Sequence, residues 1–167
     1  NKYGADSMRY YLLSSSIMRG EDLNFAEAGV DEVLKKLLLR LSNVHSFYEL
    51  YKTEKITKPN TSNVLDRWIL SRLNQLIEVA TDGMENYEID RATRPIADFI
   101  EDLSVWYLRR SRERFKGENE SDKEAALSMT RHVLIELSKV MAPFMPFYAE
   151  HLYQKLKTNA DAESVHL

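Results

Sequence analysis

Five positive residues stand together between residues 109 and 116, where a candidate helix leaves the protein core. They are Arg109, Arg110, Arg112, Arg114 and Lys116. The single carboxylate among them is Glu113, and Phe115 supplies an aromatic ring. Guanidinium groups pair with phosphate through two hydrogen bonds, and aromatic rings accept stacked bases. This pattern indicates a local surface for phosphates and bases.

A plainer interpretation of the same residues stays open. Cations near a helix C-terminus are favoured by roughly 0.3–1 kcal/mol each, because the last carbonyls carry partial negative charge. The basic run can therefore also be a solvated helix end. A second polar set lies on the outer face of an earlier helix and is either another solvated face or a weaker ligand surface: Lys35, Lys36, Arg40 and Asn43.

No residues with the spacing of a catalytic or metal site are recognisable. The four histidines are scattered and have no neighbour at the spacing of a metal-binding pair. The hydroxyls of residues 14–16 have no partner base, and no glycine-rich phosphate loop occurs. We therefore expect no catalytic residue, no metal site and no cofactor in this chain.

Composition limits the class of protein. With 167 residues, of which 44% are hydrophobic, the chain can bury one sizeable core. It has no apolar run long enough to span a membrane, no secretory leader and no cysteine. We expect a cytoplasmic protein. The net charge of −3 disfavours a protein that coats nucleic acid indiscriminately, so any nucleic-acid surface must be local.

The elements that precede this basic run are predicted from apolar residues at steps of three and four. A first helix is expected over residues 5–18, ended by Gly20, and a long amphipathic helix over 30–51. Residues 52–63 form a polar loop. A third helix covers 65–84, capped by Ser62 or Asn63.

The helix that carries the basic run is expected to start at Thr93, which places Pro95 in the first turn. Its core stripe is Ile96, Phe99, Ile100, Leu103 and Tyr107. The next helix begins at a capping box over residues 121–124 and ends at Pro143. Pro146 opens a last helix that ends near residue 157.

Several side chains outside the basic run are also assigned. Aromatic rings at helical spacing usually pack, so Trp68 and Trp106 are expected in the core. Phe144 and Phe147 are expected beneath the proline corner. Arg67 and Arg72 can equally contact a ligand or pair with Asp66 or Glu78 in the bundle.

The predicted fold class is all-α: a helical bundle of four main helices with a leading helical connector and a short closing helix. Its expected parts are a connector over residues 1–25, the bundle over 26–157 and a tail over 158–167.

Long segments in a fixed order resemble the class I aminoacyl-tRNA synthetases of the isoleucine, valine, leucine and methionine group. Residues 2–13 are similar to the segment that follows the Lys-Met-Ser-Lys-Ser loop of that family. The isoleucyl-tRNA synthetases are the most similar branch, through residues 19–25, 65–73, 106–115, 142–150 and 163–167.

The resemblance implies an α-helical anticodon-binding domain that follows the catalytic domain. The family's His-Ile-Gly-His motif, its Lys-Met-Ser-Lys-Ser loop and its editing domain are missing. We therefore expect a ligase as the parent enzyme and no activity in this chain alone. ATP and Mg²⁺ would act only in the parent enzyme.

The implied partners are tRNA(Ile) and the chain's own catalytic domain, with no membrane or DNA. The expected RNA-binding residues are Arg109, Arg110, Arg112, Arg114, Phe115 and, as weaker candidates, Lys35, Lys36, Arg40 and Asn43. Two alternatives remain: the same domain of a valyl-type sister synthetase, and a helical protein-interaction domain whose basic end only faces solvent.

Overall fold

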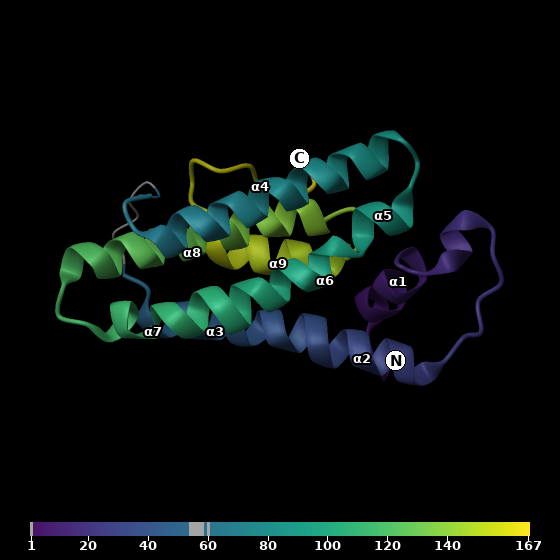
Figure 1. The fold of residues 1–167 in the computed structure, drawn as a ribbon, viewed down its shortest axis with the longest axis horizontal. Helices are drawn as coiled ribbons and strands as arrows, with labels where there is room; N and C mark the ends of the chain where they lie inside the picture. The colour runs from purple at the N-terminus through teal and green to yellow at the C-terminus, as the bar shows by residue number, and fades with distance from the viewer. Residues whose placement is uncertain (1, 54–58, 60) are drawn as a thin grey trace.

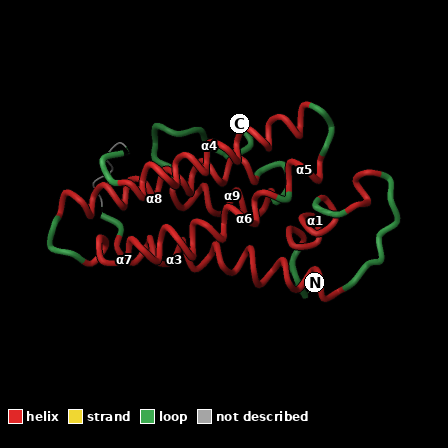
Figure 2. Tube along the Cα trace, in the orientation of Figure 1, coloured by secondary structure: helices red, strands yellow, loops and turns green. Residues whose placement is uncertain are grey.

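The computed structural model describes residues 2–53, 59 and 61–167, and these residues form helices and loops without a strand (Figures 1 and 2). The α-helices are α1 (Ala5–Leu13), α2 (Glu27–Val33), α3 (Leu39–Tyr51), α4 (Val64–Glu85), α5 (Ile89–Thr93), α6 (Pro95–Glu101), α7 (Arg109–Lys116), α8 (Glu120–Met141) and α9 (Pro146–Leu156). The predicted all-α class is confirmed.

Two long helical rods are built from several of these elements. The π-helical segment η2 (Leu34–Leu38) joins α2 to α3, and η3 (Asp102–Leu108) joins α6 to α7, with helical backbone at each junction. The long helix predicted from residue 30 is confirmed and begins at Glu27. The rods lie side by side in Figure 1, with α4 against α8 and α9 packed on α8.

The core lies between these rods and the α4–α8–α9 layer. It is a single cluster of apolar side chains from every long helix. Among the largest side chains with almost no exposed surface are Tyr107, Phe99, Phe115, Phe144, Leu41 and Ile69. The predicted stripe of α6 and η3 is therefore confirmed as core.

Of the two predicted N-terminal caps of long helices, the cap of α4 is confirmed and the cap of α8 is not. Asn63 caps α4 by accepting a hydrogen bond from the backbone N–H of Leu65 at 2.8 Å, as predicted. The capping box at 121–124 is wrong: α8 starts earlier, and Asn119 accepts from the N–H of Asp122 at 3.2 Å. Residues 54–58 and 60 of the predicted loop lie outside the described residues.

The described part of the first 25 residues contacts the bundle through α1, which packs on α5 and α9. The predicted helix to residue 18 is wrong, since α1 ends at Leu13 and a separate 3₁₀ segment, η1 (Ser16–Arg19), follows. Gly20 ends η1 with a φ of 76°, as expected of a glycine C-cap. The buried Asp6 accepts from the N–H of Tyr148 at 2.6 Å.

The proline positions explain two further differences. The predicted helix start at Thr93 is wrong. Thr93 is the last residue of a separate short helix, α5, and the helix that follows, α6, begins at Pro95. Pro146 opens α9, as predicted. Phe144 is buried beneath this corner, but Phe147 is exposed, because it points outward from the first turn of α9.

The tail after α9 returns along the bundle. Arg131 of α8 donates two hydrogen bonds to the carbonyl of Leu156, at 3.0 and 2.8 Å. Glu150 accepts from the N–H of Val165 at 2.9 Å. Among the described residues, no helix is both long enough and apolar enough to cross a membrane.

Candidate nucleic-acid interface

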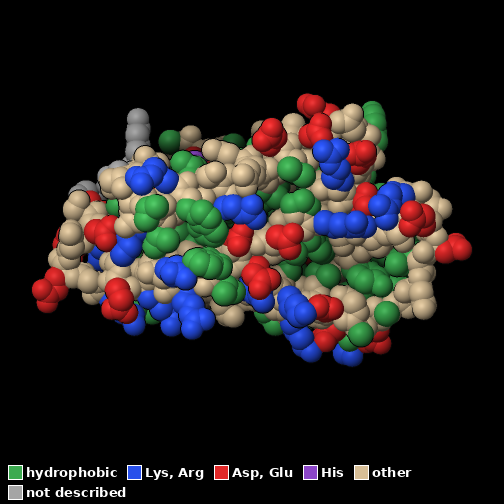
Figure 3. All heavy atoms as spheres, in the orientation of Figure 1, with side chains coloured by type: hydrophobic (Ala, Val, Ile, Leu, Met, Phe, Trp, Pro, Cys, Tyr) green, Lys and Arg blue, Asp and Glu red, His purple; other side chains and the backbone are tan. Residues whose placement is uncertain are grey.

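Helix α7 presents the basic run at one end of the bundle. The rod of α6, η3 and α7 is anchored in the core by Leu103, Tyr107 and Phe115, which fixes the direction in which its outer side chains point. Figure 3 shows Lys and Arg side chains gathered over the end of the bundle that α3 and α7 form. The exposed arginines of this run are Arg109, Arg110 and Arg112.

These three guanidinium groups are not neutralised within the described part of the chain. No described residue forms a hydrogen bond or an ion pair with any of them. Some other exposed cations of the protein do have carboxylate partners, as Arg91 does with Asp82 at 2.7 Å. An unpaired guanidinium keeps its donors available, so these three side chains are chemically able to bind a phosphate.

A hollow of about 400 Å³ lies between this helix and α3. It is lined by Asn43, Val44, Ser104, Val105, Leu108, Arg109 and Arg112. The structure thus brings together three predicted residues from two separate segments: Asn43, Arg109 and Arg112. We call this hollow the α3–α7 cleft. Two guanidinium groups beside an amide and a hydroxyl can hold a phosphate and one polar edge of a base or sugar.

The structure does not place Phe115, predicted to stack a base, on the surface. Its ring is 0% exposed and packs edge-on against Phe47 of α3, with ring centroids 5.2 Å apart. Phe115 shares the buried face of the rod with Tyr107, two turns earlier, so it anchors α7 instead of contacting a ligand. Phe47 itself lies under Arg112, whose guanidinium carbon is 5.9 Å from the ring centroid.

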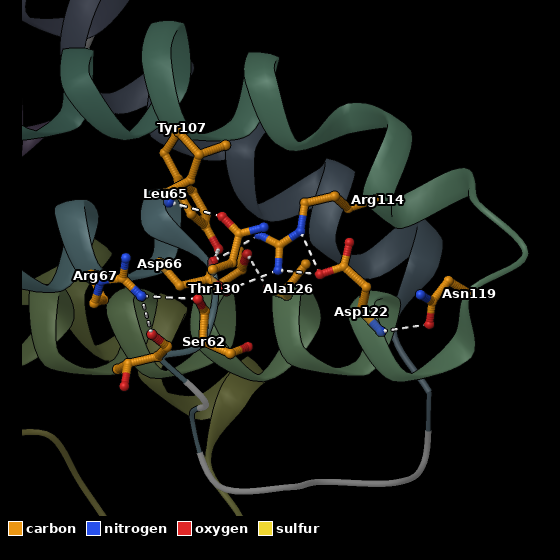
Figure 4. Close-up of polar contacts among 12 residues, drawn as sticks. Ser62, Leu65, Asp66, Arg67, Tyr107, Arg114, Asn119, Asp122, Ala126 and Thr130 are labelled. Carbon is orange, nitrogen blue, oxygen red and sulfur yellow. Dashed lines mark hydrogen bonds and ion pairs between the residues drawn. The ribbon is translucent and has the colours of Figure 1, made fainter.

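The guanidinium of Arg114, another predicted RNA contact, does not lie on the surface with the other arginines but forms hydrogen bonds inside the bundle (Figure 4). Its side chain is only 10% exposed. Two nitrogens donate to the two oxygens of Asp66 at 2.8 Å each, and Nε donates to Asp122 at 2.9 Å. Arg114 thereby ties α7 to the first turns of α4 and α8.

The same carboxylate holds a buried tyrosine. The hydroxyl of Tyr107 donates to Asp66 Oδ1 at 2.7 Å, and Asp66 has no exposed surface. Burial, followed by the charge of Asp66, raises the pKa of Tyr107 well above its usual range. Burial lowers the pKa of Arg114, but the hydrogen bonds to Asp66 and Asp122 outweigh it and raise the net value. Both groups keep their hydrogen atoms at neutral pH.

The weaker candidates lie farther from the basic run. Lys35 pairs with Asp31, and Lys36 pairs with Glu32, one helical turn earlier. Arg40 faces Glu101 of α6 at 3.3 Å. Their charges are therefore partly balanced within the chain, unlike those of the α3–α7 cleft. Asn43 alone of this set lies in the cleft.

Two further sequence assignments are corrected. Arg72 pairs with Asp102 at 2.8 Å, and Arg67 donates to the backbone carbonyls of Thr61 and Ser62, so neither pairs with Asp66 or Glu78 as predicted. The carboxylate of Asp66 instead accepts hydrogen bonds from Arg114 and Tyr107.

Trp106 is the site feature that the sequence prediction missed. It is 49% exposed, not buried, and the guanidinium carbon of Arg110 lies 3.9 Å from its ring centroid. Trp68 of α4 is half-buried, with its ring centroid 6.2 Å from that of Trp106. The four-residue spacing of Trp106 and Arg110 was a visible signal, because such residues are neighbours on a helix surface.

No group of three or more acidic or histidine side chains that could hold a metal ion occurs among the described residues.

Comparison with known proteins identifies the family of this domain. A family model described as the anticodon-binding domain of tRNA ligase matches residues 66–167. The fold agrees with it: the chain aligns with a leucyl-tRNA synthetase ternary complex from Agrobacterium radiobacter K84 at a TM-score of 0.62 and 21% identity, over 95% of this chain and 19% of that one. At this level of identity the similarity concerns the fold alone.

A Mycobacterium tuberculosis methionyl-tRNA synthetase in complex with methionyl-adenylate gives a TM-score of 0.68 at 18% identity, over 98% of this chain and 35% of that one. Because the family model matches more than half of the chain, the chain belongs to the anticodon-binding domain family of tRNA ligases.

The curated relatives make the relationship more specific. The chain is 47% identical to an isoleucine–tRNA ligase of Chlamydia trachomatis serovar D over 99% of this chain and 16% of that protein. The corresponding protein of Chlamydia caviae is 42% identical over 100% of this chain and 17% of its own length. The predicted resemblance to isoleucyl-tRNA synthetases is confirmed, and the chain corresponds to about a sixth of each relative.

Proposed function

We propose that this chain grips the anticodon stem–loop of tRNA(Ile) and that its parent is an isoleucine–tRNA ligase. The observation that carries the proposal is the α3–α7 cleft, where Arg109 and Arg112 stand without a carboxylate partner among the described residues, beside Asn43. The family to which the chain belongs is defined by binding at the anticodon, and this cleft is the described surface best suited to RNA phosphates.

The chemistry of binding follows from the residue types. Unpaired loop bases can be splayed out and read by side chains while cations hold the phosphates. Arg109 and Arg112 would each form paired hydrogen bonds with a phosphate of the loop, and the Asn43 amide would read a polar edge. The rest of the chain has an excess of negative charge, since the net charge is −3. RNA would therefore be directed to this one end.

The role of the bound anticodon is positioning. Binding energy gained far from the reacting atoms can orient the other end of the tRNA in a distant catalytic site. ATP and Mg²⁺ would serve that catalytic domain. Arg114 contributes indirectly, because it fixes α7 and so fixes the direction of the three exposed arginines.

The test is a fluorescence-anisotropy titration of the chain with tRNA(Ile) and with the same tRNA carrying a valine or a methionine anticodon, each over a salt series. We expect tighter binding to the isoleucine anticodon and affinity that falls as salt rises. Preference for the valine anticodon would favour the valyl-type alternative. No binding at low salt would contradict the proposal and favour the protein-interaction alternative.

A further inference from the structure

A second hollow, of about 610 Å³, lies where α1, η2 and α9 meet. Its apolar lining comes from three segments that are distant in the sequence: Tyr3, Leu34, Leu38, Leu39, Phe147 and Tyr148. We call it the α1–η2–α9 hollow. It is a separate feature from the α3–α7 cleft, because the two have no described lining residue in common.

Two large apolar side chains of this hollow face solvent. Phe147 is 70% exposed and Leu39 is 49% exposed. Single exposed apolar residues are normal on a protein surface, but a contiguous apolar set around a hollow is typical of a surface that contacts another protein segment. The burial that the sequence predicted for Phe147 would then come from a surface outside this chain.

The hollow also holds a polar group that lacks a partner. Asp6 lines the hollow and is only 5% exposed. Its Oδ2 accepts a hydrogen bond from the backbone N–H of Tyr148, whereas its Oδ1 is buried without a hydrogen-bond partner among the described residues. An unsatisfied buried acceptor is unfavourable, so a surface that fits this hollow would carry a hydrogen-bond donor beside its apolar groups.

The position of the hollow indicates which surface covers it. Residues 3–6 form part of its wall, so the polypeptide that leads into this chain in the parent protein would pass directly beside it. The chain corresponds to about a sixth of each isoleucine–tRNA ligase that it matches. Figure 1 shows α1 at the opposite end of the molecule from α7, so RNA bound at α7 would leave this hollow free.

We propose that the catalytic domain that precedes this chain in the parent enzyme docks on the α1–η2–α9 hollow. Its apolar side chains cover Phe147 and Leu39, and one of its donors pairs with Asp6. This inference rests on the proposed parent enzyme and names the surface that holds the bundle to the domain it serves.

The proposed contact suits the positioning role of the bundle. Leu39 in the hollow and Asn43 in the α3–α7 cleft are one turn apart on α3, so a contact at Leu39 would fix the helix that lines the cleft. An apolar interface restricts the relative motion of two domains, which a polar contact of the same size does less well. Bound RNA would therefore keep a defined orientation relative to the catalytic site.

The first experiment measures side-chain exposure by hydroxyl-radical labelling and mass spectrometry, for the isolated chain and for the parent protein. We expect the labelling of Phe147 and Leu39 to fall by about fivefold or more in the parent, because the centre of an interface loses most of its contact with water. Leu50, which is 73% exposed and does not line the hollow, is the control and should be labelled to a similar extent in both.

The second experiment places a charge in the hollow. In the parent, Phe147→Glu is expected to lower kcat/KM for tRNA aminoacylation by about tenfold, as for a residue at the centre of an interface. Isoleucine-dependent ATP–pyrophosphate exchange should be unchanged, because that reaction needs no tRNA. In the isolated chain the same substitution should leave stem–loop affinity unchanged. Leu50→Glu is the matched control, and circular dichroism checks that each variant is folded.

The outcomes separate this inference from the proposed function. Equal labelling of Phe147 in the isolated chain and in the parent would overturn the docking surface and leave anticodon binding intact. Labelling of Phe147 that rises when the isolated chain is diluted would assign the hollow to a second copy of the chain and would also overturn it. Absence of isoleucine-dependent exchange in the unmodified parent would instead overturn the proposed parent enzyme.

Discussion

Neighbouring arginines of one short helix have different roles, and their position around the helix decides which. Arg114 points inward to Asp66, whereas Arg109, Arg110 and Arg112 point outward. The basic run on this helix could be predicted from the sequence, and three of its arginines are exposed. The burial of Arg114 could not, because its partner Asp66 lies 48 residues away along the chain and only the tertiary fold brings them together.

Replacing Arg114 should destabilise the protein. Arg114→Ala leaves the carboxylate of Asp66 buried with only Tyr107 as a partner, and removing one member of a buried ion pair costs about 3–5 kcal/mol. The free energy of unfolding is measured by urea denaturation. Arg112→Ala is the matched control and should change this free energy by less than about 0.5 kcal/mol, since its side chain is exposed. Equal effects of the two substitutions would contradict the assigned roles.

At the scale of elements, the long helices and most of their ends were predictable, because apolar spacing and caps such as Asn63 are local signals. The π-helical segment η3 was not. A periodicity of three and four cannot distinguish α from π turns. Trp106 was assigned to the core because aromatic rings at helical spacing usually pack, and that general rule does not hold at this position. The short helix α5 was missed for a related reason: it is one turn long and is held by contact with α4.

The contact between α4 and α5 depends on a glycine. A Cβ atom at Gly83 would lie 2.9 Å from the backbone nitrogen of Ala92 and 3.0 Å from its Cβ. Gly83→Ala should therefore lower the free energy of unfolding by about 1–3 kcal/mol, despite the better helix propensity of alanine. Ser71→Ala, at an exposed position of the same helix, is the control and should be neutral or slightly stabilising. If the melting temperature rose for both variants, α5 would have shifted to make room for the new methyl group, and the predicted clash with Ala92 would be contradicted.

At the scale of the whole molecule, buried tyrosines make the fold sensitive to high pH. Burial raises the pKa of Tyr10 and Tyr107, and it raises that of Tyr148 to about 12. A raised pKa in the folded state means that the stabilisation is complete below the unfolded value near pH 10 and is lost as pH rises above it. We expect the free energy of unfolding to fall between about pH 10 and 12.

Each tyrosine that ionises only on unfolding adds about 1.4 kcal/mol per pH unit to this decline. Tyr107→Phe should make the slope shallower by about that amount, while Tyr87→Phe, at an exposed ring, serves as the control. Urea denaturation at several pH values measures the slope. An identical slope for Tyr107→Phe and the unmodified chain would contradict the assigned burial effect.

The chain should not catalyse amino-acid activation by itself. It corresponds to 16% of an isoleucine–tRNA ligase and lacks the two nucleotide-binding motifs of the family. Isoleucine-dependent ATP–pyrophosphate exchange should stay at the level of a blank without protein. Exchange that rises with the concentration of the purified chain would contradict this expectation.

The most direct test of the central claim compares two double variants of equal charge change. The first double variant, Arg109→Ala with Arg112→Ala, removes the unpaired cations of the α3–α7 cleft. The second, Lys35→Ala with Lys36→Ala, removes two cations of η2 that already form ion pairs with carboxylates. The affinity for an anticodon stem–loop RNA is measured for both across a salt series.

The account predicts that the arginine pair weakens binding and reduces the slope of log affinity against log salt by about 2, one for each lost phosphate contact. The lysine pair should leave both nearly unchanged. An equal loss of RNA affinity in the two double variants would contradict the assignment of the cleft. So would an unchanged slope of log affinity against log salt in the variant without Arg109 and Arg112, because the RNA would then be bound elsewhere.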